Sequence, residues 1–206
     1  MKTDFCSSET RKNLMRAFAG ECQSRQRYYQ AALIAQQEKY VGLERMFRFT
    51  AEQEERHAKV FFELLKDCAG ESIRIEADYP ADVYSTLPEL LKASAAEEYH
   101  EAAEVYPEFE QIARKEGFLD AAGKFKMIAS IEQEHHKRFD YYSQLMENGT
   151  LFRSESTDEA WICLNCGHIH TASEPPSDCP VCGAEKGYFI RLAEAPFTFG
   201  GMLVQN

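Results

Sequence analysis

Two stretches of this 206-residue chain carry the same short motif, a glutamate followed three residues later by a histidine. The two pairs are Glu54 with His57 and Glu132 with His135, and residues three apart share one face of a helix. Glu21 stands 33 residues before Glu54, and Glu98 stands 34 residues before Glu132. Glu101 follows Glu98 by about one helical turn. The candidate set on the inward helical stripes is Glu21, Glu54, His57, Glu98, Glu101, Glu132 and His135.

Five carboxylates that face one another in a helical core need positive charge between them. An isolated buried carboxylate costs several kcal/mol, and like charges in one site drive proton uptake. Two divalent cations would bring four positive charges and nearly balance the set. A glutamate from each of two helices, with Glu-x-x-His from the other two, is the ligand pattern of ferritin-like di-iron bundles. The sequence therefore predicts a dinuclear site, and oxygen-rich ligands with two imidazoles favour iron or manganese over zinc.

Four of the seven cysteines form two Cys-x-x-Cys pairs near the C-terminus, separated by twelve residues. The pairs are Cys163 with Cys166 and Cys179 with Cys182. Four thiolates at this spacing make a closed tetrahedral site for zinc or for a single iron ion, and the spacing alone does not separate the two metals. Two disulfides are disfavoured by the odd, clustered set of cysteines. Few apolar residues surround the pairs, so the metal is expected to contribute folding energy.

A change of composition near residue 149 divides the chain. Before it Ala, Glu, Gln, Lys, Arg and Leu dominate, a mixture that favours helix, and after it Gly, Pro, Ser, Thr and Cys prevail. We expect a mainly α protein with a four-helix bundle at 1–150, a small β module at 158–195 and a C-terminal extension at 196–206. The predicted helices are 8–37, 41–68, 88–116 and 118–147, with an irregular stretch at 71–86 and short strands near 160–163, 168–171 and 187–191. Pro107 is expected to kink the third helix.

The helical part contains an internal repeat. A shift of 78 residues brings the two Glu-x-x-His pairs and their flanking phenylalanines into register. The aligned residues are Phe47, Glu54, His57 and Phe61 with Phe125, Glu132, His135 and Phe139. The shift between Glu21 and Glu98 is 77, and Glu101 breaks the repeat because its counterpart is Ser24. The first two helices therefore look like a copy of the last two, with an approximate twofold axis between two metal positions.

The combination of these motifs resembles the rubrerythrin family over about residues 10–192. Shorter strings carry the same resemblance: AFAGE at 17–21, EEYHE at 97–101 followed by Tyr106-Pro107, and HKRF at 136–139. The resemblance implies a ferritin-like bundle followed by a rubredoxin-like module in which the four cysteines bind one iron. It implies that the iron ligands of the bundle are Glu21, Glu54, Glu98, Glu101, Glu132 and His135.

The resemblance also implies roles for further residues of the bundle. His57 would bind iron in the reduced state and exchange with Glu101 as one iron shifts on oxidation. An extra carboxylate on one side, at Glu101, makes the two metal positions unequal and agrees with this exchange. Tyr28 and Tyr106 match tyrosines that lie near the site in the family, although ordinary core packing explains them equally well.

The function that the resemblance implies is reduction of hydrogen peroxide to water in oxidative-stress defence. The mononuclear iron would pass on single electrons from an external donor, a rubredoxin or an NAD(P)H-dependent reductase. About 24 Å of helix separates Glu132 from Asn148 at 1.5 Å per residue, so a head-to-tail homodimer, or a larger oligomer, would bring a partner's cysteine site closer.

Composition limits the other partners. A net charge of −11 argues against nucleic acid and anionic membranes, and no apolar run approaches the ~20 residues of a membrane span. Because Met1–Cys6 has no apolar signal-peptide core, a cytoplasmic location is expected.

Three other functions fit parts of the pattern. A ferroxidase or iron-storage protein shares the bundle but has no use for the cysteine module. A zinc-binding regulatory protein and an oxygenase with an organic substrate are the other two. Outside the inward stripes, His100 and His136 are interpreted as surface residues, Cys22 should point away from the stripe, and Cys6 has no assigned role.

Overall fold

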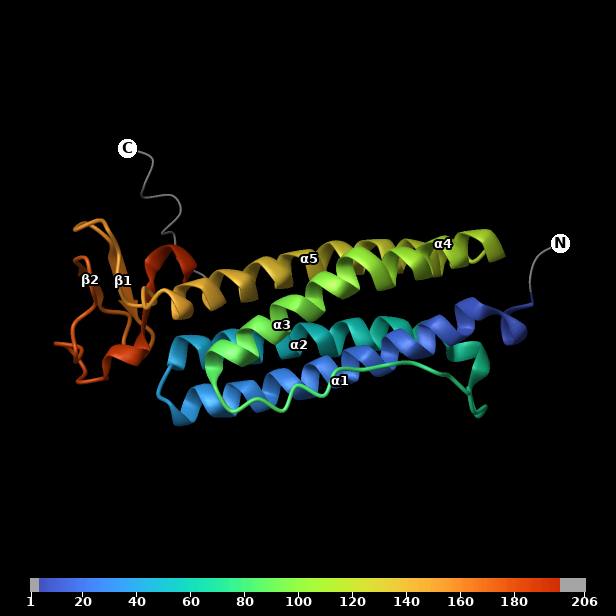
Figure 1. Cartoon of the computed structure of the whole chain (residues 1–206), viewed down its shortest axis with the longest axis horizontal. Helices are drawn as coiled ribbons and strands as arrows, with labels where there is room; N and C mark the ends of the chain where they lie inside the picture. The colour runs from blue at the N-terminus through green and yellow to red at the C-terminus, as the bar shows by residue number, and fades with distance from the viewer. Residues whose placement is uncertain (1–3, 197–206) are drawn as a thin grey trace.

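The computed structural model describes residues 4–196 and consists of a long helical bundle with a small β module at one end (Figure 1). The helices are α1 (Glu9–Gln37), α2 (Val41–Leu64), α3 (Leu87–His100), α4 (Tyr106–Glu116) and α5 (Leu119–Glu147). A π-helical turn, Glu101–Val105, joins α3 to α4, so these two form the third helix of a four-helix bundle. The mainly helical, ferritin-like fold expected from the sequence is confirmed. The predicted extension 196–206 lies outside the described residues except for Pro196.

The ends of α1 and α4 are held together by polar contacts. Ser8 caps α1, because its hydroxyl accepts a hydrogen bond from the Arg11 amide at 3.1 Å. The Glu116 carboxylate accepts hydrogen bonds from the Thr10 amide at 2.8 Å and the Glu9 amide at 3.0 Å, which satisfies two free N–H groups of the first turn. Gly117 ends α4 with a φ of 90°, a left-handed conformation that favours glycine.

The disturbance expected at Pro107 takes the form of the π turn. The Tyr106 amide donates to the Glu101 carbonyl, five residues back, instead of four. Pro107 follows in the first turn of α4, where its missing N–H costs no helical hydrogen bond. The third helix therefore continues past the proline, with one wide turn next to the candidate ligands.

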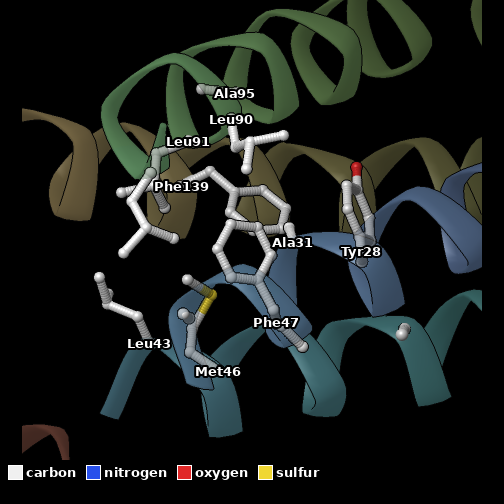
Figure 2. Close-up of a cluster of buried hydrophobic side chains, with 13 residues drawn as sticks. Tyr28, Ala31, Leu43, Met46, Phe47, Leu90, Leu91, Ala95 and Phe139 are labelled. Atoms are coloured by element: carbon white, nitrogen blue, oxygen red, sulfur yellow. The ribbon is translucent and has the colours of Figure 1, made fainter. Parts of the chain in front are cut away.

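Two apolar clusters fill the bundle on either side of the Glu-x-x-His level. One contains Phe47 and Phe139, whose rings lie together in Figure 2 with centroids 5.3 Å apart. It also contains Tyr28, whose ring centroid lies 4.9 Å from that of Phe139. The other contains Phe61 and Phe125, with centroids 5.2 Å apart. The 78-residue repeat relates these two phenylalanine pairs, so similar aromatic layers close both ends of the metal level.

The irregular stretch 71–86 crosses the bundle as an extended strap beside α1 (Figure 1). Arginines of α1 hold it: Arg11 Nη2 lies 2.6 Å from Glu71 Oε2, and Arg27 Nη1 lies 2.9 Å from Asp82 Oδ2. The Tyr79 hydroxyl donates to the Arg16 carbonyl at 2.9 Å. The strap leads from the short 3-10 turn Lys66–Cys68 after α2 to the start of α3 at the opposite end of the bundle.

The C-terminal module is built on three short antiparallel strands. They are β1 (Ala160–Cys163), β2 (Ile169–Thr171) and β3 (Phe189–Arg191), in the order β2-β1-β3, close to the predicted positions. Its buried core consists of Trp161, Cys163, Cys179 and Phe189. Trp161 is fully buried and donates through Nε1 to the Ala172 carbonyl at 2.9 Å. So small a core includes two of the metal-binding cysteines.

The module docks on the turn between α1 and α2 (Figure 1). Lys39 Nζ lies 2.7 Å from Glu185 Oε1, and Arg45 Nη1 donates to the Leu164 carbonyl at 3.2 Å. The backbone approach is closest at Gly187, where an added Cβ would stand 1.8 Å from the Lys39 carbonyl oxygen. Because Gly187 has no side chain, the module can pack this closely against the backbone of Lys39.

Candidate metal centre

All of the candidate bundle ligands are buried at one level of the helices. Glu21, Glu54, Glu98, Glu132 and His135 have no exposed surface, and His57 and Glu101 are 7% and 6% exposed. They come from α1, α2, α3, the π turn and α5. The inward stripes deduced from helical periodicity therefore do meet in the core.

A first group of four side chains surrounds His57. Its members are Glu21, Glu54, His57 and Glu132, and one donor atom of each lies within 4.8 Å of all the others. His57 Nδ1 lies 2.9 Å from Glu132 Oε1, 3.1 Å from Glu54 Oε2 and 3.6 Å from Glu21 Oε2.

A second group surrounds His135 in the same way. Its members are Glu54, Glu98, Glu132 and His135. His135 Nδ1 lies 2.7 Å from Glu132 Oε2, 2.9 Å from Glu54 Oε1 and 3.5 Å from Glu98 Oε2. Glu54 and Glu132 belong to both groups, each with one oxygen towards each histidine, which is the arrangement of carboxylates that bridge two cations.

Unpaired buried atoms show that the two groups fit cations. Glu21 Oε2, Glu54 Oε1, Glu98 Oε2, both Glu132 oxygens and His135 Nδ1 are buried without a hydrogen-bond partner. Leaving such atoms unpaired is costly. They converge from several helices, and oxygen with imidazole nitrogen is the donor set that iron accepts. Two cations at these positions would satisfy all of these atoms together.

Without metal the site must hold protons instead. Burial, together with the neighbouring Glu54 carboxylate, raises the pKa of Glu98 to about 8. Burial and nearby carboxylates also raise the pKa values of Glu21 and Glu101 well above their ordinary value. Burial alone would lower the pKa of His135, but the adjoining carboxylates of Glu132 and Glu54 raise it to about 12. The cluster is therefore short of positive charge at neutral pH.

Two tyrosines orient the terminal carboxylates across the repeat. The Tyr28 hydroxyl donates to Glu98 Oε1, and the Tyr106 hydroxyl donates to Glu21 Oε1. In each case the second oxygen, Oε2, is left facing the histidines. Burial raises the pKa of both tyrosines well above 10, so each keeps its proton. The positions of Tyr28 and Tyr106 beside the site agree with the expectation from the sequence.

Glu101 lies apart from both four-residue groups. It opens the π turn, and it lines a cavity of about 330 Å³ together with Gly20, Tyr79 and Tyr106. A Cβ added at Gly20 would lie 3.6 Å from both Glu101 Oε1 and the Tyr79 ring, so the glycine leaves room on this side of the site. The cavity opens at the surface, and Glu101 is the candidate ligand that lines it.

Residues outside the inward stripes correct or complete the sequence analysis. His100 is exposed as expected, but His136 is half-buried and its Nδ1 lies 2.8 Å from the Ala95 carbonyl oxygen, so its interpretation as a surface residue is wrong. The reason is that α3 packs over this face of α5. Cys22 is exposed, as predicted. Sequence reasoning missed Gln53, which contacts His135 from outside the stripe, and Arg138, which donates to Gln53.

The four C-terminal cysteines converge in the β module. Their sulfurs lie within 4.8 Å of one another, with 3.8 Å between Cys163 and Cys182 and 3.6 Å between Cys166 and Cys179. The Asn165 side chain donates to Cys182 Sγ at 3.4 Å, and this hydrogen bond lowers the pKa of Cys182 to about 6. Such a thiol is a thiolate at neutral pH, the form that binds metal.

Each cysteine pair is a tight knuckle of the same shape. The amide of the glycine after each pair donates at 2.8 Å to the carbonyl of the first cysteine, from Gly167 to Cys163 and from Gly183 to Cys179. Both glycines have positive φ, 79° and 73°. The Cys-x-x-Cys-Gly pattern is thus explained by the local backbone as well as by the metal.

Comparisons with known proteins agree with both sites. A family model described as Rubrerythrin matches residues 12–142, and one described as Rubrerythrin, rubredoxin-like domain matches residues 161–190. Rubrerythrin of Porphyromonas gingivalis is 40% identical over 190 residues, which cover 92% of each chain. Rubrerythrin of Nitratidesulfovibrio vulgaris is 39% identical over 185 residues, 90% of this chain and 95% of that one.

Solved structures show the same arrangement of elements. Nigerythrin in a mixed-valence state has a TM-score of 0.59 at 25% identity, over 92% of this chain and 93% of that one. The bacterioferritin of Desulfovibrio desulfuricans has a TM-score of 0.62 at 22% identity over 69% of this chain and 82% of its own, a likeness of fold alone. Within residues 4–196, no helix combines the length and apolar character needed to cross a bilayer.

Proposed function

This chain belongs to the rubrerythrin family, and we propose that it is a non-haem di-iron peroxidase that reduces hydrogen peroxide to water. The family makes it an iron protein of oxidative-stress defence, with a di-iron bundle and a rubredoxin-like iron module. The observation that carries the proposal is the pair of buried Glu/His groups sharing Glu54 and Glu132, with oxygens that have no other partner.

The proposed iron ligands follow the two groups. One iron would be held by Glu21, Glu54, His57 and Glu132, and the other by Glu54, Glu98, Glu132 and His135. Glu101 would replace His57 when the first iron is oxidised. The contacts of His57 with three carboxylates, from which Glu101 stands apart, support His57 as the ligand of the reduced state.

The chemistry that two iron ions would supply, held by these glutamates and histidines, is binding of the peroxide and transfer of one electron from each ion. The protein's own residues provide access, orientation and protons. The cavity at Glu101 and Gly20 is the path for a small polar substrate. Burial and neighbouring carboxylates raise the pKa of Glu101 well above its ordinary value, so this carboxyl can hold a proton at the cavity wall. Two protons and two electrons convert one hydrogen peroxide to two waters.

Electrons would reach the bundle from the cysteine module. Cys166 and Cys182 are exposed, as is Val181 inside the second knuckle at 67%. An external donor such as a rubredoxin or an NAD(P)H-dependent reductase can therefore approach an iron bound there closely. The module contacts α2 near Gly42, twelve residues before Glu54, about 18 Å of helix at 1.5 Å per residue. A head-to-tail homodimer, or a larger oligomer, would shorten this path, and sedimentation that shows an active monomer would rule it out.

A reducing compartment suits this chemistry. The described free cysteines outside the module, Cys6, Cys22 and Cys68, stay reduced there, and so do the metal-binding ones. The cytoplasm is accordingly the proposed location. A ferroxidase or iron-storage role is the alternative, and it leaves the docked cysteine module without a use.

The deciding experiment is anaerobic reduction of the iron-loaded protein followed by one equivalent of hydrogen peroxide in a stopped-flow spectrometer. We expect rapid reoxidation of both iron centres. In Tyr106→Phe, which removes the hydrogen bond to Glu21, the peroxide step should slow by about 10–100-fold, as changes next to metal ligands do. Tyr99→Phe, at a half-exposed ring, is the matched control. Reoxidation by oxygen only, with peroxide accumulating, would favour the ferroxidase.

A further inference from the structure

One imidazole of the bundle site is held from outside, by a chain of hydrogen bonds. His135 Nε2 lies 3.1 Å from Gln53 Oε1. Arg138 Nη1 donates to the same oxygen at 3.2 Å and to Thr50 Oγ1 at 2.9 Å. The Thr50 hydroxyl in turn donates to the Met46 carbonyl at 3.1 Å, and Thr50 is fully buried. These hydrogen bonds connect the backbone of α2, through Arg138 of α5, to the side of the His135 ring that faces away from the carboxylates.

The chemistry of these groups fixes the orientation of His135. A guanidinium can only donate hydrogen bonds, so Gln53 Oε1 is an acceptor and His135 Nε2 must carry a proton and donate to it. The metal-facing nitrogen is therefore Nδ1, which lies among the carboxylates 2.7 Å from Glu132 Oε2. Rotating the ring away from this position would break the bond to Gln53.

The repeat shows what the other half of the bundle lacks. The residues that stand 78 positions from Thr50, Gln53 and Arg138 are Ile128, Ile131 and Val60. None of these apolar side chains can accept or donate a hydrogen bond. Accordingly, His57 Nε2 has no hydrogen-bond partner within residues 4–196, although His57 Nδ1 faces three carboxylates as His135 Nδ1 does. The two histidines have equivalent inner contacts and different outer ones.

We infer that Gln53 and Arg138 are positioning residues that keep His135 on its iron, and that the apolar residues in their place make His57 the exchangeable ligand. An acceptor behind a ligand imidazole orients the ring and makes it a stronger ligand. His57 can rotate away without breaking an outer hydrogen bond. The inference rests on the iron pair alone, and neither of its tests needs peroxide turnover.

The first test removes the acceptor behind His135. In anaerobically reduced, iron-loaded protein, we expect one hyperfine-shifted imidazole N–H proton that exchanges slowly with D₂O, from His135, and a fast one from His57. Gln53→Leu should abolish the slow signal and speed release of one iron to a chelator by about 10–100-fold. Gln53→Glu keeps an acceptor and should restore both properties towards those of the parent.

The variant Ile131→Gln makes the equivalent change near His57, in the other half of the repeat. It tests the inference even if Gln53→Leu does not fold. It places an acceptor where the repeat puts one relative to His57, at a side chain that is 37% exposed. A second slowly exchanging N–H, with slower iron release, supports the inference. Identical N–H exchange and iron release in the parent, Gln53→Leu and Ile131→Gln overturn it.

A separate cluster at the far end of the bundle carries a second inference. Sulfurs of Cys6 and Cys68 and a carboxylate oxygen of Glu71 lie within 4.8 Å of one another. Cys6 is exposed in the short turn before α1, and Cys68 is buried at the end of the turn after α2. Arg11 already holds the Glu71 carboxylate at 2.6 Å, which disfavours a cation at this position.

We propose that Cys6 and Cys68 form a disulfide when peroxide is in excess, which would join the start of α1 to the end of α2. The Cys6 thiol gives up its proton, and the thiolate attacks one peroxide oxygen. The O–O bond breaks, Cys6 becomes a sulfenic acid, and the departing hydroxide takes up the released proton to form water. Cys68 then attacks that sulfur, forming the S–S bond and releasing a second water. Desolvation by neighbouring atoms and the Glu71 carboxylate raise the pKa of Cys6, so the reaction should quicken as the pH rises.

Peptide mapping of the peroxide-treated holoprotein tests this step. We expect a peptide pair cross-linked through Cys6 and Cys68, with a mass two hydrogens below the sum of the two peptides. The exposed Cys22 is not part of this cluster and should remain open to alkylation. In Cys68→Ser, Cys6 should stop at the sulfenic acid, which dimedone traps. Peroxide treatment that oxidises Cys22 and leaves Cys6 and Cys68 alkylatable would overturn the proposal.

Discussion

The two metal-binding regions of this chain are built in opposite ways. The bundle site draws its residues from Glu21 to His135, on helices that are packed by large apolar clusters on both sides. The cysteine site uses four residues from Cys163 to Cys182, on two backbone knuckles with a core of four side chains. In the bundle a preformed fold accommodates charges, whereas in the module the metal site is itself half of the core. The comparison teaches that metal removal should damage the two regions very differently.

The largest effect is expected from removing metal from the module. Cys179→Ser replaces a buried ligand, and the small remaining core should not fold alone. Trp161 is the only tryptophan of the chain and is fully buried, so its fluorescence should shift to the red while the helical circular dichroism persists. A tryptophan that stays buried in this variant would show that the module folds without metal, contrary to the comparison.

Gly187→Ala should separate the regions without unfolding either. An added Cβ would stand 1.8 Å from the Lys39 carbonyl oxygen, which is backbone and cannot yield easily. We expect overpacking to cost about 1–3 kcal/mol of docking free energy, with greater motion of the module in ¹⁵N relaxation. Gly123→Ala, where a Cβ meets nothing within 4 Å, is the matched control and should stabilise α5 by roughly 0.5–1 kcal/mol. If ¹⁵N relaxation of the module is unchanged in Gly187→Ala, the close packing of Gly187 against Lys39 does not hold the module in place.

The metal-free bundle should lose stability as the pH rises from about 4.5 to about 8. Burial raises the pKa of Glu98 from 4.5 to about 8, so the folded protein holds a proton in this range that the unfolded chain releases. Because the folded state then binds more protons, the free energy of unfolding falls with increasing pH. The melting temperature of the metal-free protein measures this, and Glu98→Gln should flatten the dependence. A melting temperature that rises towards pH 8 would refute the expectation.

The smallest effect is expected at the exposed ion pair between the regions. Lys39 and Glu185 are 66% and 55% exposed, and solvent screens such pairs. Lys39→Ala should leave the unfolding midpoint and the module's relaxation as in the parent. A change as large as that of Gly187→Ala would mean that charge, and not backbone fit, seats the module.

Helical periodicity was enough to predict which polar side chains converge in the core of the bundle, because residues three and four apart share one face of a helix. It could not reveal Gln53 and Arg138, which lie beside the stripe and matter through contacts between α2 and α5. For the same reason it misplaced His136, which is half-buried against α3.

The only trace of the wide turn of the third helix in the sequence is a change in the shift that aligns the two repeats. The shift between halves changes from 77 at Glu21 and Glu98 to 78 at Tyr28 and Tyr106, so one residue is inserted between them. The structure places it in the π turn Glu101–Val105. An insertion can be counted from the sequence, but whether it forms a bulge, a kink or a loop depends on packing against α5.

The tyrosine bonds that cross between the two copies bear on ancestry. Tyr28 of the first copy holds Glu98 of the second, and Tyr106 of the second holds Glu21 of the first. Each histidine likewise needs a carboxylate from the other copy, Glu132 for His57 and Glu54 for His135. A lone ancestral hairpin would thus supply three of the four residues of one group and only one of the four residues of the other. The smallest forerunner with both groups complete would be a symmetric pair of identical hairpins, in which Glu101 has no counterpart.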